Sequence, residues 1–484
     1  MSTTTGNQRR RRRRREKSGS SSSSPPEWIL VNKGVYTGNH RGNSTTAVGE
    51  GRENLTIQVS LSPAQPPRPS NVLLCCPGVR YPRESEVLFT ADDLLLLRVP
   101  VAAGPAPSCI GFDECDYLIY RAAGGDGWPS LTLLPNPDPN FHDGDVGILP
   151  RAGGEYTVAA LVANPTENEY TLTRFDSAAG EGWTTKTDGH AASAAAGENP
   201  HQRAATQPPH DHHDHHNRRR IRAMGWVDLW TGILVYDLLR PGSGDSLRHL
   251  PLPLPMHAIT CNHRMGDELA LPCPRSLRGI VSFTKRDTGK PCLRLAGLAG
   301  ERLPYSDIET QLPAFAVHDW TVTTWTNTHM AGYYEDWHEE FTVRGSDVRI
   351  SDAVRSQLIA SGLLQRKPSR DGETVVEELA LHHLYVSQPT PSLNNGEEDD
   401  HVVYLMASPK CLHPKAWALA LDMRNSTLLN VAEFGTETGP SLGVTYRPST
   451  IQVHESADSS SDWENLRLLL IICNQDGTTG LFGD

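Results

Sequence analysis

The stretch MGWVDLWTGILVYDLL, residues 224–239, contains two runs of strand-forming residues separated by a turn. The first run, 226–230, begins and ends with tryptophan, and the second, 233–238, is rich in branched and aromatic residues that pack well on a pleated surface. Thr231 and Gly232 lie between them, and glycine supplies the positive φ that tight turns require. The stretch therefore predicts a β-hairpin.

The same pattern of two runs around a turn recurs along the chain. The sequence has 41 glycines and 36 prolines, which indicates many turns and few long helices. Once residues 178–220 are set aside, the hairpins recur roughly every 40 to 50 residues, a period typical of repeat and propeller architectures. The other expected hairpins are 117–121 with 131–134, 156–163 with 170–175, 279–285 with 292–298, and 416–422 with 427–434, and 467–473 is a further strand.

One helix interrupts this series. Ser351 is a suitable N-terminal cap, Val354, Leu358 and Ile359 lie on one helical face, and Gly362 fits the C-terminal stop. A single helix among many hairpins is an embellishment, so the sequence predicts an all-β protein.

The expected architecture is a β-propeller-like ring of about six to eight blades in one domain, residues 27–484. Radial repetition leaves only short, shielded sheet edges, whereas a sandwich of this length leaves long edges to protect. Two domains of sandwich type stay open as the alternative. In the propeller, tryptophans would pack between neighbouring sheets, and the candidates are Trp128, Trp183, Trp226, Trp230, Trp320, Trp325, Trp417 and Trp463.

Two segments lack apolar residues at the spacing of either a helix or a strand. Residues 1–26 hold seven consecutive arginines and a serine run, and we expect a disordered tail there. Residues 178–220, which include a histidine-rich tract, predict a long surface insertion of low complexity. The seven arginines and Lys17, against Glu16, give the tail a charge of +7. Since the formal net charge of the whole chain is −12, the rest of the chain carries −19. Such an acidic body argues against nucleic-acid binding outside the tail.

The compartment follows from the cysteines and from the N-terminus. No apolar segment follows the basic run, so we expect no signal peptide. The longest apolar stretch, 468–473, is far shorter than the ~20 residues that span a bilayer, and we expect no membrane partner. The nine cysteines form no Cys-x-x-Cys pair, which is typical of a reducing compartment. We therefore expect an intracellular protein of the nucleus or cytoplasm.

The block 225–239, with Leu-Arg-His-Leu-Pro-Leu-Pro at 247–253 after it, resembles the plant family called domain of unknown function 1618, which is expanded mainly in grasses. The resemblance is strongest over 224–360. It implies a propeller-like plant domain without an assigned activity. Relatives accompany F-box modules, but the segment before Trp28 has no room for such a helical bundle. Further parts of the chain resemble the same family in their order and spacing, namely 28–30, 320–322, Trp337, 403–406, Trp417 and Asp422.

The motifs that suggest catalysis have stronger structural interpretations. Residues 439–443 read Gly-Pro-Ser-Leu-Gly, but the strand and helix of a nucleophile elbow are not expected around Ser441, and His454 precedes Asp458 in the wrong order. Asp228 and Asp237 flank the strongest hairpin, where we expect them to accept hydrogen bonds from nearby backbone or indole groups. We therefore predict no catalytic and no cofactor-binding residues, and no cofactor.

Two charged tracts and one histidine pair complete the candidates. His382 and His383 would point to opposite faces of a strand. The histidine tract lacks the fixed geometry of a metal site, so we expect adventitious binding of Zn or Ni at most. The arginine tract is a candidate for nuclear targeting. The weak metal candidates are His212, His213, His215 and His216, and the targeting candidates are Arg9, Arg10, Arg11, Arg12, Arg13, Arg14 and Arg15.

The sequence by itself does not establish what the protein does, and it leaves two hypotheses. The first is a non-enzymatic protein-interaction scaffold whose partner protein is unknown. The second is a hydrolase or glycan-active propeller that uses acidic residues in its central channel. An enzyme requires several carboxylates or histidines that converge in the channel, whereas a binding module requires an exposed apolar patch.

Overall fold

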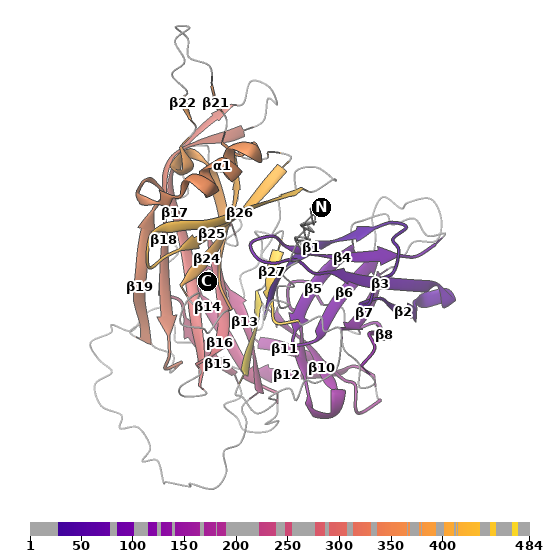
Figure 1. The fold of residues 1–484 in the computed structure, drawn as a ribbon. Helices are drawn as coiled ribbons and strands as arrows, with labels where there is room; N and C mark the ends of the chain where they lie inside the picture. The colour runs from indigo at the N-terminus through magenta and orange to yellow at the C-terminus, as the bar shows by residue number, and fades with distance from the viewer. Residues whose placement is uncertain are drawn as a thin grey trace, which may run out of the picture.

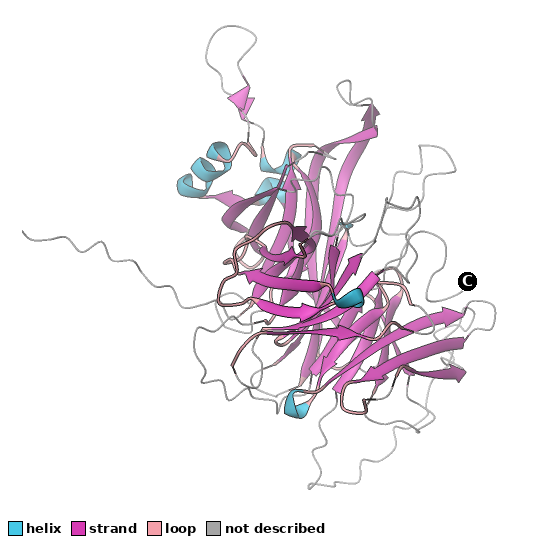
Figure 2. Ribbon diagram, turned by 90° about the vertical axis from the view of Figure 1, so that its right-hand side faces the viewer, coloured by secondary structure: helices cyan, strands magenta, loops and turns pink. Residues whose placement is uncertain are grey.

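The computed structural model of the protein is built mainly of β-strands, as Figure 2 shows. The expected tail, 1–26, lies outside the described residues. The described residues are 28–77, 85–100, 115–122, 127–137, 141–164, 169–180, 182–189, 222–238, 247–253, 276–285, 290–306, 313–330, 336–364, 366–367, 377–378, 380–393, 401–410, 413, 415–435, 446–451 and 467–472.

The N-terminal part of the chain forms one nine-stranded sheet in two halves, which we call sheet 1 and sheet 2. In the described residues, the register pairs Gly34–Glu86 and Val35–Ser85 join the halves through β1 and β5, and the strands β2 and β8 also lie beside each other. Sheet 1 contains β1 (Ile29–Thr37), β2 (Ala47–Glu50), β3 (Thr56–Ser62), β4 (Ser70–Cys75) and, paired with β1, β27 (Tyr446–Ser449). Sheet 2 contains β5 (Ser85–Ala91), β6 (Leu94–Pro100), β7 (Cys115–Arg121) and β8 (Ser130–Leu134).

Four further sheets follow in chain order, and Figure 1 traces them from magenta to yellow. Sheet 3 contains β9 (Val146–Pro150), β10 (Tyr156–Asn164), β11 (Glu169–Asp176) and β12 (Thr184–Gly189). Sheet 4 contains β13 (Arg222–Asp228), β14 (Gly232–Asp237), β15 (Leu247–Pro251) and β28 (Arg467–Ile472). Sheet 5 contains β16 (Arg278–Thr284), β17 (Pro291–Ser306), β18 (Pro313–Asn327) and β19 (Trp337–Arg344). Sheet 6 contains β20 (Arg349–Ile350), β23 (Tyr385–Pro391), β24 (Val402–Ser408), β25 (Lys415–Asp422) and β26 (Thr427–Gly435).

The remaining elements are short. The helix α1 (Asp352–Ala360) packs against β26, and β21 (Arg366–Lys367) pairs with β22 (Glu377–Glu378). The predicted helix is confirmed: the Ser351 hydroxyl accepts a hydrogen bond from the Val354 N–H at 3.3 Å, Val354 and Leu358 are buried, and Gly362 follows the helix at a φ of 82°. It is the one α-helix in the part of the chain that the structure describes.

The strands in the middle of the sheets are apolar on both faces because both faces are covered. Six of the seven residues of β7 are buried, and so are five of the six residues of β14. At the outer edge the pattern changes, since Ser130 and Thr132 of β8 are exposed while Leu134 is buried. A sheet packed by neighbours on both faces reads as a continuous apolar run rather than as an alternation.

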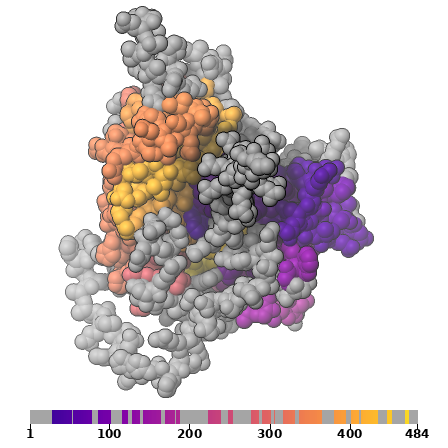
Figure 3. Space-filling view, viewed as in Figure 1, coloured from indigo at the N-terminus to yellow at the C-terminus, as the bar shows by residue number. Residues whose placement is uncertain are grey.

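The hydrophobic cores lie between successive sheets and close a ring. One core joins sheets 1 and 2, the largest joins sheets 2, 3 and 4, another joins sheets 4 and 5, and another joins sheets 5 and 6. The last core brings Trp28 and Leu30 of the N-terminal part against Val402, Tyr404 and Ala420 of sheet 6. Figure 3 shows both surfaces on one face of the molecule, the yellow surface of sheet 6 on the left and the indigo N-terminal surface on the right. The all-β fold is therefore confirmed, and the described sheets pack in a propeller-like ring when the two halves of the nine-stranded sheet are counted separately.

Aromatic side chains tie each sheet to the next. Four indole N–H groups donate to backbone carbonyls across the sheet boundaries, Tyr120 of sheet 2 donates to the Thr45 carbonyl beside sheet 1 at 2.7 Å, and Trp28 meets Tyr404 edge-on with ring centroids 5.3 Å apart. Such pairs satisfy buried donors and add packing energy. The indole bonds are Trp183 to Pro135 at 2.8 Å, Trp226 to Asp145 at 2.7 Å, Trp320 to Leu381 at 3.2 Å, and Trp337 to Pro251 at 2.8 Å.

Three local expectations need correction. Trp128 does not pack between sheets, because it precedes the outermost strand β8 and is 71% exposed. The turn of the hairpin at 224–239 lies at 229–231, since β13 ends at Asp228. Residues 184–189, expected within the irregular insertion, form β12, which pairs with β11 over six residues. Trp463 and residues 190–220 lie outside the described residues.

Candidate functional site

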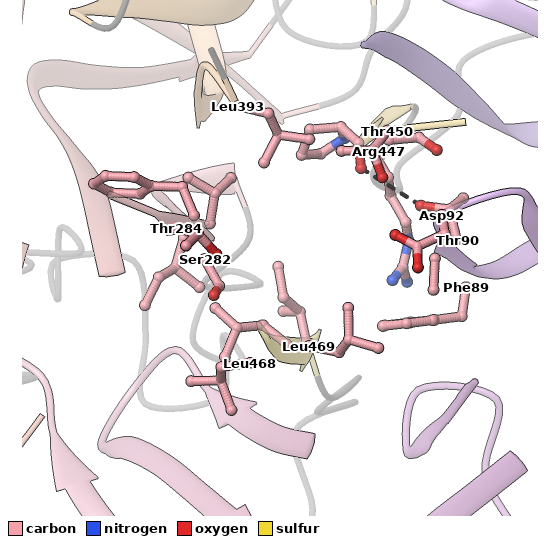
Figure 4. A pocket seen from close by; sticks show the side chains of 18 of the residues that line it. Phe89, Thr90, Asp92, Ser282, Thr284, Leu393, Arg447, Thr450, Leu468 and Leu469 are labelled. Atoms are coloured by element: carbon pink, nitrogen blue, oxygen red, sulfur yellow. Dashed lines mark hydrogen bonds between the residues drawn. The ribbon is translucent and has the colours of Figure 1, made fainter. Parts of the chain in front are cut away.

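A cavity of about 450 Å³ lies among the innermost strands of the ring. Its walls come from β5 and the turn after it, from β16, β27 and β28, and from Leu393 after β23, so sheets 1, 2, 4, 5 and 6 all contribute. Figure 4 shows these side chains around the cavity. The volume falls within the range of sites that hold small molecules.

Two strands from the C-terminal part of the chain build the wall. Strand β27 pairs antiparallel with β1 from Ile29 opposite Ser449, and β28 pairs in parallel with β13 along its whole length. Both therefore insert into sheets formed by much earlier residues. Their placement explains why a cavity at the centre of the ring depends on residues more than 200 positions apart in the sequence.

Close backbone contact between sheets 5 and 6 closes the wall beside the cavity. Gly279 of β16 faces β23 so closely that a Cβ atom there would lie 1.9 Å from the Pro389 carbonyl oxygen. A similar contact occurs between sheets 3 and 4, where a Cβ on Gly147 would lie 2.6 Å from the Ile471 side chain. Glycine at these two positions lets the inner strands approach each other.

The lining combines polar groups on two sides, leucines between them and few charges. Figure 4 shows Thr90, Asp92 and Arg447 on one side of the cavity and Ser282 and Thr284 on the other. Leucines of β28 and Leu393 lie between these polar groups. Asp92, Lys285 and Arg447 are the charged groups among the described lining residues, which gives this lining one negative and two positive charges.

Arg447 is held by a rigid strand. Tyr446 before it is 2% exposed, its ring belongs to the core between sheets 1 and 6, and its hydroxyl lies 3.5 Å from the Gln388 carbonyl. Burial raises the pKa of Tyr446 far above its usual value, so this anchor stays uncharged. The carbonyl of Pro448 accepts a hydrogen bond from the Thr90 hydroxyl at 3.5 Å. The positions on both sides of Arg447 are thus fixed before any ligand arrives.

A second candidate surface lies on sheet 5. Strand β17 pairs with β18 along the whole hairpin, from Leu293 opposite Asn327 to Ser306 opposite Pro313. Strand β16 covers β17 only as far as Gly297, and β19 covers β18 only from Thr321 onward. Residues 301–306 with 313–317 therefore extend beyond the four-stranded sheet as a two-stranded ribbon, which we call the arm.

The arm carries exposed apolar side chains. Leu303 is 56% exposed and Tyr305 is 43% exposed, and their spacing places them on one face of the strand. The register places Ala316, also exposed, opposite Leu303. An isolated two-stranded ribbon is marginal in water, so an apolar face here is a feature to explain.

A cluster of ion pairs joins sheets 1, 2 and 3 away from the cavity. Lys33 lies 3.0 Å from Glu86, Arg98 lies 3.8 Å from Glu86, and Arg98 also pairs with Asp143. Burial raises the pKa of Asp143, and the charge of Arg98 opposes that shift. Each member has a partner, and the cluster links three sheets, which identifies it as structural.

Asp228 has the structural role that the sequence predicts. It is 2% exposed, its carboxylate accepts the Trp230 N–H at 2.9 Å and the Thr231 hydroxyl at 2.8 Å, and these bonds shape the turn after β13. Burial lowers the pKa of Arg278 to about 10, and the negative charge of Asp228 partly offsets this. Asp237, at the end of β14, is only partly buried and does not line the cavity.

The expectation for the histidine pair is wrong. His382 and His383 lie in a 3₁₀ turn (Leu381–His383) rather than in a strand, and their ring centroids are 4.1 Å apart. His383 Nδ1 lies 3.1 Å from the Val317 carbonyl, which ties this turn to sheet 5. The alternation argument fails because a 3₁₀ turn does not place successive side chains on opposite faces.

The other candidate residues lie outside the described part of the chain. These are Ser441, His454, the histidine candidates at 212–216 and the arginine candidates at 9–15. Within the described ranges, no group of three or more His, Cys, Asp or Glu side chains is placed to hold a metal ion. Cys75, Cys76, Cys115 and Cys292 are thiols. No helix in the described residues has the length and apolar character needed to cross a membrane.

The cavity residues were not found from the sequence. Asp92, Lys285 and Arg447 come from three sheets, and nothing local marks them as neighbours. The one local signal is the tight turn between β5 and β6, where Asp92 adopts a left-handed φ of 50°. Asp and Asn tolerate that conformation, so the signal indicates a turn and not a site.

Fold and cavity together define a propeller-like all-β protein with a small-molecule-sized cavity at its centre. Residues 226–404, from β13 to β24, match the model of the family described as "Protein of unknown function (DUF1618)". The likeness to that family is shown for this part of the chain. It contains most of the segment 224–360, where the resemblance is strongest, and leaves out 28–30, Trp417 and Asp422. None of the curated proteins matches the chain.

Proposed function

We propose that the protein is a non-enzymatic scaffold that binds an extended, apolar segment of a partner protein on the arm. The observation that carries the proposal is the exposure of Leu303 and Tyr305 on a ribbon that leaves its sheet. Contiguous exposed apolar groups are typical of interaction surfaces. The ring then acts as the rigid base from which the arm extends.

The backbone of the arm supports the same mode of binding. Beyond Gly297 on β17, and before Thr321 on β18, no described strand pairs with the outer edge of the arm. An open edge offers backbone donors and acceptors to an incoming strand, and alternate side chains then select the partner. A strand with apolar residues at every second position fits both features.

The cavity gives less support to the enzymatic alternative. A glycosidase of the usual kind needs two carboxyl groups about 5 to 9.5 Å apart. Asp92 is the single carboxylate among the described lining residues. That the protein is not an enzyme stays a prediction.

The arm proposal is tested with two charge substitutions and a matched control. Leu303→Asp with Tyr305→Asp places charges on the arm, and Leu429→Asp, at a leucine 44% exposed on β26, places one elsewhere. The plant family that the sequence resembles makes plant cells the place to look for the partner. Proximity labelling there identifies candidate partners, and titration calorimetry with each purified candidate measures binding to the full chain.

The proposal predicts a partner that binds the unsubstituted protein and the Leu429→Asp variant with equal affinity. The same partner binds the variant with both Leu303→Asp and Tyr305→Asp at least tenfold more weakly. Equal binding of the arm variant by every partner refutes the proposal.

We further propose that the arginine tract at 9–15 directs the protein to the nucleus. The test compares the distribution of fluorescent fusions with and without residues 1–26. An unchanged distribution rejects this role.

A further inference from the structure

The cavity at the centre of the ring has a composition that the scaffold proposal does not use. Leu469, Leu470 and Ile472 of β28 line the cavity and are only partly buried although they lie on an inner strand. Partly exposed leucines in a concave site are what an apolar ligand covers on binding. The ligand therefore has an apolar body.

The charges of the cavity indicate what else the ligand carries. Among the described lining residues Arg447 and Lys285 oppose Asp92, a net charge of +1 in a chain whose formal net charge is −12. A positive cavity inside an acidic protein favours an anion. Surroundings of low dielectric strengthen such a preference, and the leucines contribute apolar surface to the wall.

Arg447 is the group best placed to fix an anion. Its strand is anchored by Tyr446 on one side and by the Pro448 carbonyl on the other, at 3.5 Å from the Thr90 hydroxyl. In Figure 4 its guanidinium extends along the cavity beside Thr90 and Asp92. A guanidinium matches the two oxygens of a carboxylate, and anchoring reduces the entropy lost when the ligand binds.

We infer that the cavity binds a small organic acid, with its carboxylate at Arg447 and its apolar body against β28. The volume of about 450 Å³ limits the ligand to a molecule of small drug-like size. This site is independent of the arm, so either proposal can fail without the other.

The test uses the full chain and three probes of one shape: phenylacetate, its neutral amide phenylacetamide, and the cation phenethylamine. Saturation-transfer NMR and titration calorimetry give the affinity of each. The variant Arg447→Met removes the charge and keeps an unbranched side chain. Arg355→Met on the exposed face of α1 is the matched control, and Ser282→Phe reduces the cavity volume without touching a charge.

We expect phenylacetate to bind at least tenfold more tightly than either analogue. Arg447→Met lowers the affinity for phenylacetate at least tenfold, to the affinity for the amide. The Ser282→Phe variant no longer binds phenylacetate, and the Arg355→Met control binds it with unchanged affinity. A hydrogen bond between the guanidinium and a carboxylate is strong enough to account for a tenfold difference in affinity. Urea unfolding of each variant confirms that the binding is measured on folded protein.

Three results overturn the inference: no binding of phenylacetate, equal binding of the acid and the amide, or equal binding by the Arg447→Met and Arg355→Met variants. Should Arg447→Met not fold, the acid–amide comparison and Ser282→Phe still decide the outcome.

Discussion

Replacing Gly279 by alanine tests the closeness of sheets 5 and 6. The new Cβ atom would lie 1.9 Å from the Pro389 carbonyl oxygen, whereas real Cβ contacts essentially never fall below 3.0 Å. The two strands would have to separate by about 1.1 Å, and the obstacle is backbone rather than a flexible side chain. Overpacking a close-packed interior typically costs ~1 to 3 kcal/mol. For a backbone obstacle we expect the upper end, about 3 kcal/mol.

The control is Gly182→Ala, because a Cβ at Gly182 meets nothing within 4 Å. At a compatible position the change from glycine to alanine stabilises by ~0.4 to 1 kcal/mol through the unfolded chain. Urea unfolding, followed by tryptophan fluorescence and circular dichroism, gives the free energy of unfolding of each variant. A Gly279→Ala protein within about 0.5 kcal/mol of the control would show that the two inner strands do not touch.

Two further predictions concern single side chains. Trp226→Phe removes the indole hydrogen bond to the Asp145 carbonyl and some buried volume, so we expect it to lower the free energy of unfolding by about 1 to 3 kcal/mol. The control Trp128→Phe, at an exposed site, should lower it by less than ~0.5 kcal/mol. Equal losses for the two variants in urea titrations contradict this prediction. Burial lowers the pKa of His249, so the unfolded chain takes up the proton first and stability falls as the pH drops below ~6.5. His249→Gln should flatten this fall between pH 7 and 5, and an unchanged pH profile of the unfolding midpoint contradicts the assignment.

Local patterns were enough to predict most hairpins and the helix. The pairs β7–β8, β10–β11, β16–β17 and β25–β26 lie where two apolar runs separated by turn residues indicate them. Ser351 and Gly362 define the helix because capping depends on residues within one turn. These features are decided by neighbours in the sequence.

Other features depend on distant residues and could not be predicted in this way. Strand β28 was expected, but its parallel partner β13 lies more than 200 residues earlier. The arm arises because β16 and β19 are shorter than β17 and β18, which no pattern within β17 reveals. The cavity is the sum of such distant pairings, so its chemistry appears only once the ring has closed.

Coupling between Trp28 and Tyr404 is the most direct measure of whether sheets 1 and 6 meet. Their ring centroids are 5.3 Å apart, although 376 positions separate them in the sequence. A double-mutant cycle with Trp28→Leu and Tyr404→Leu in urea unfolding isolates their interaction. A closed ring predicts a coupling energy of ~0.5 to 1.5 kcal/mol, and additive effects, with a coupling energy near zero, would mean that the ring is open at this joint.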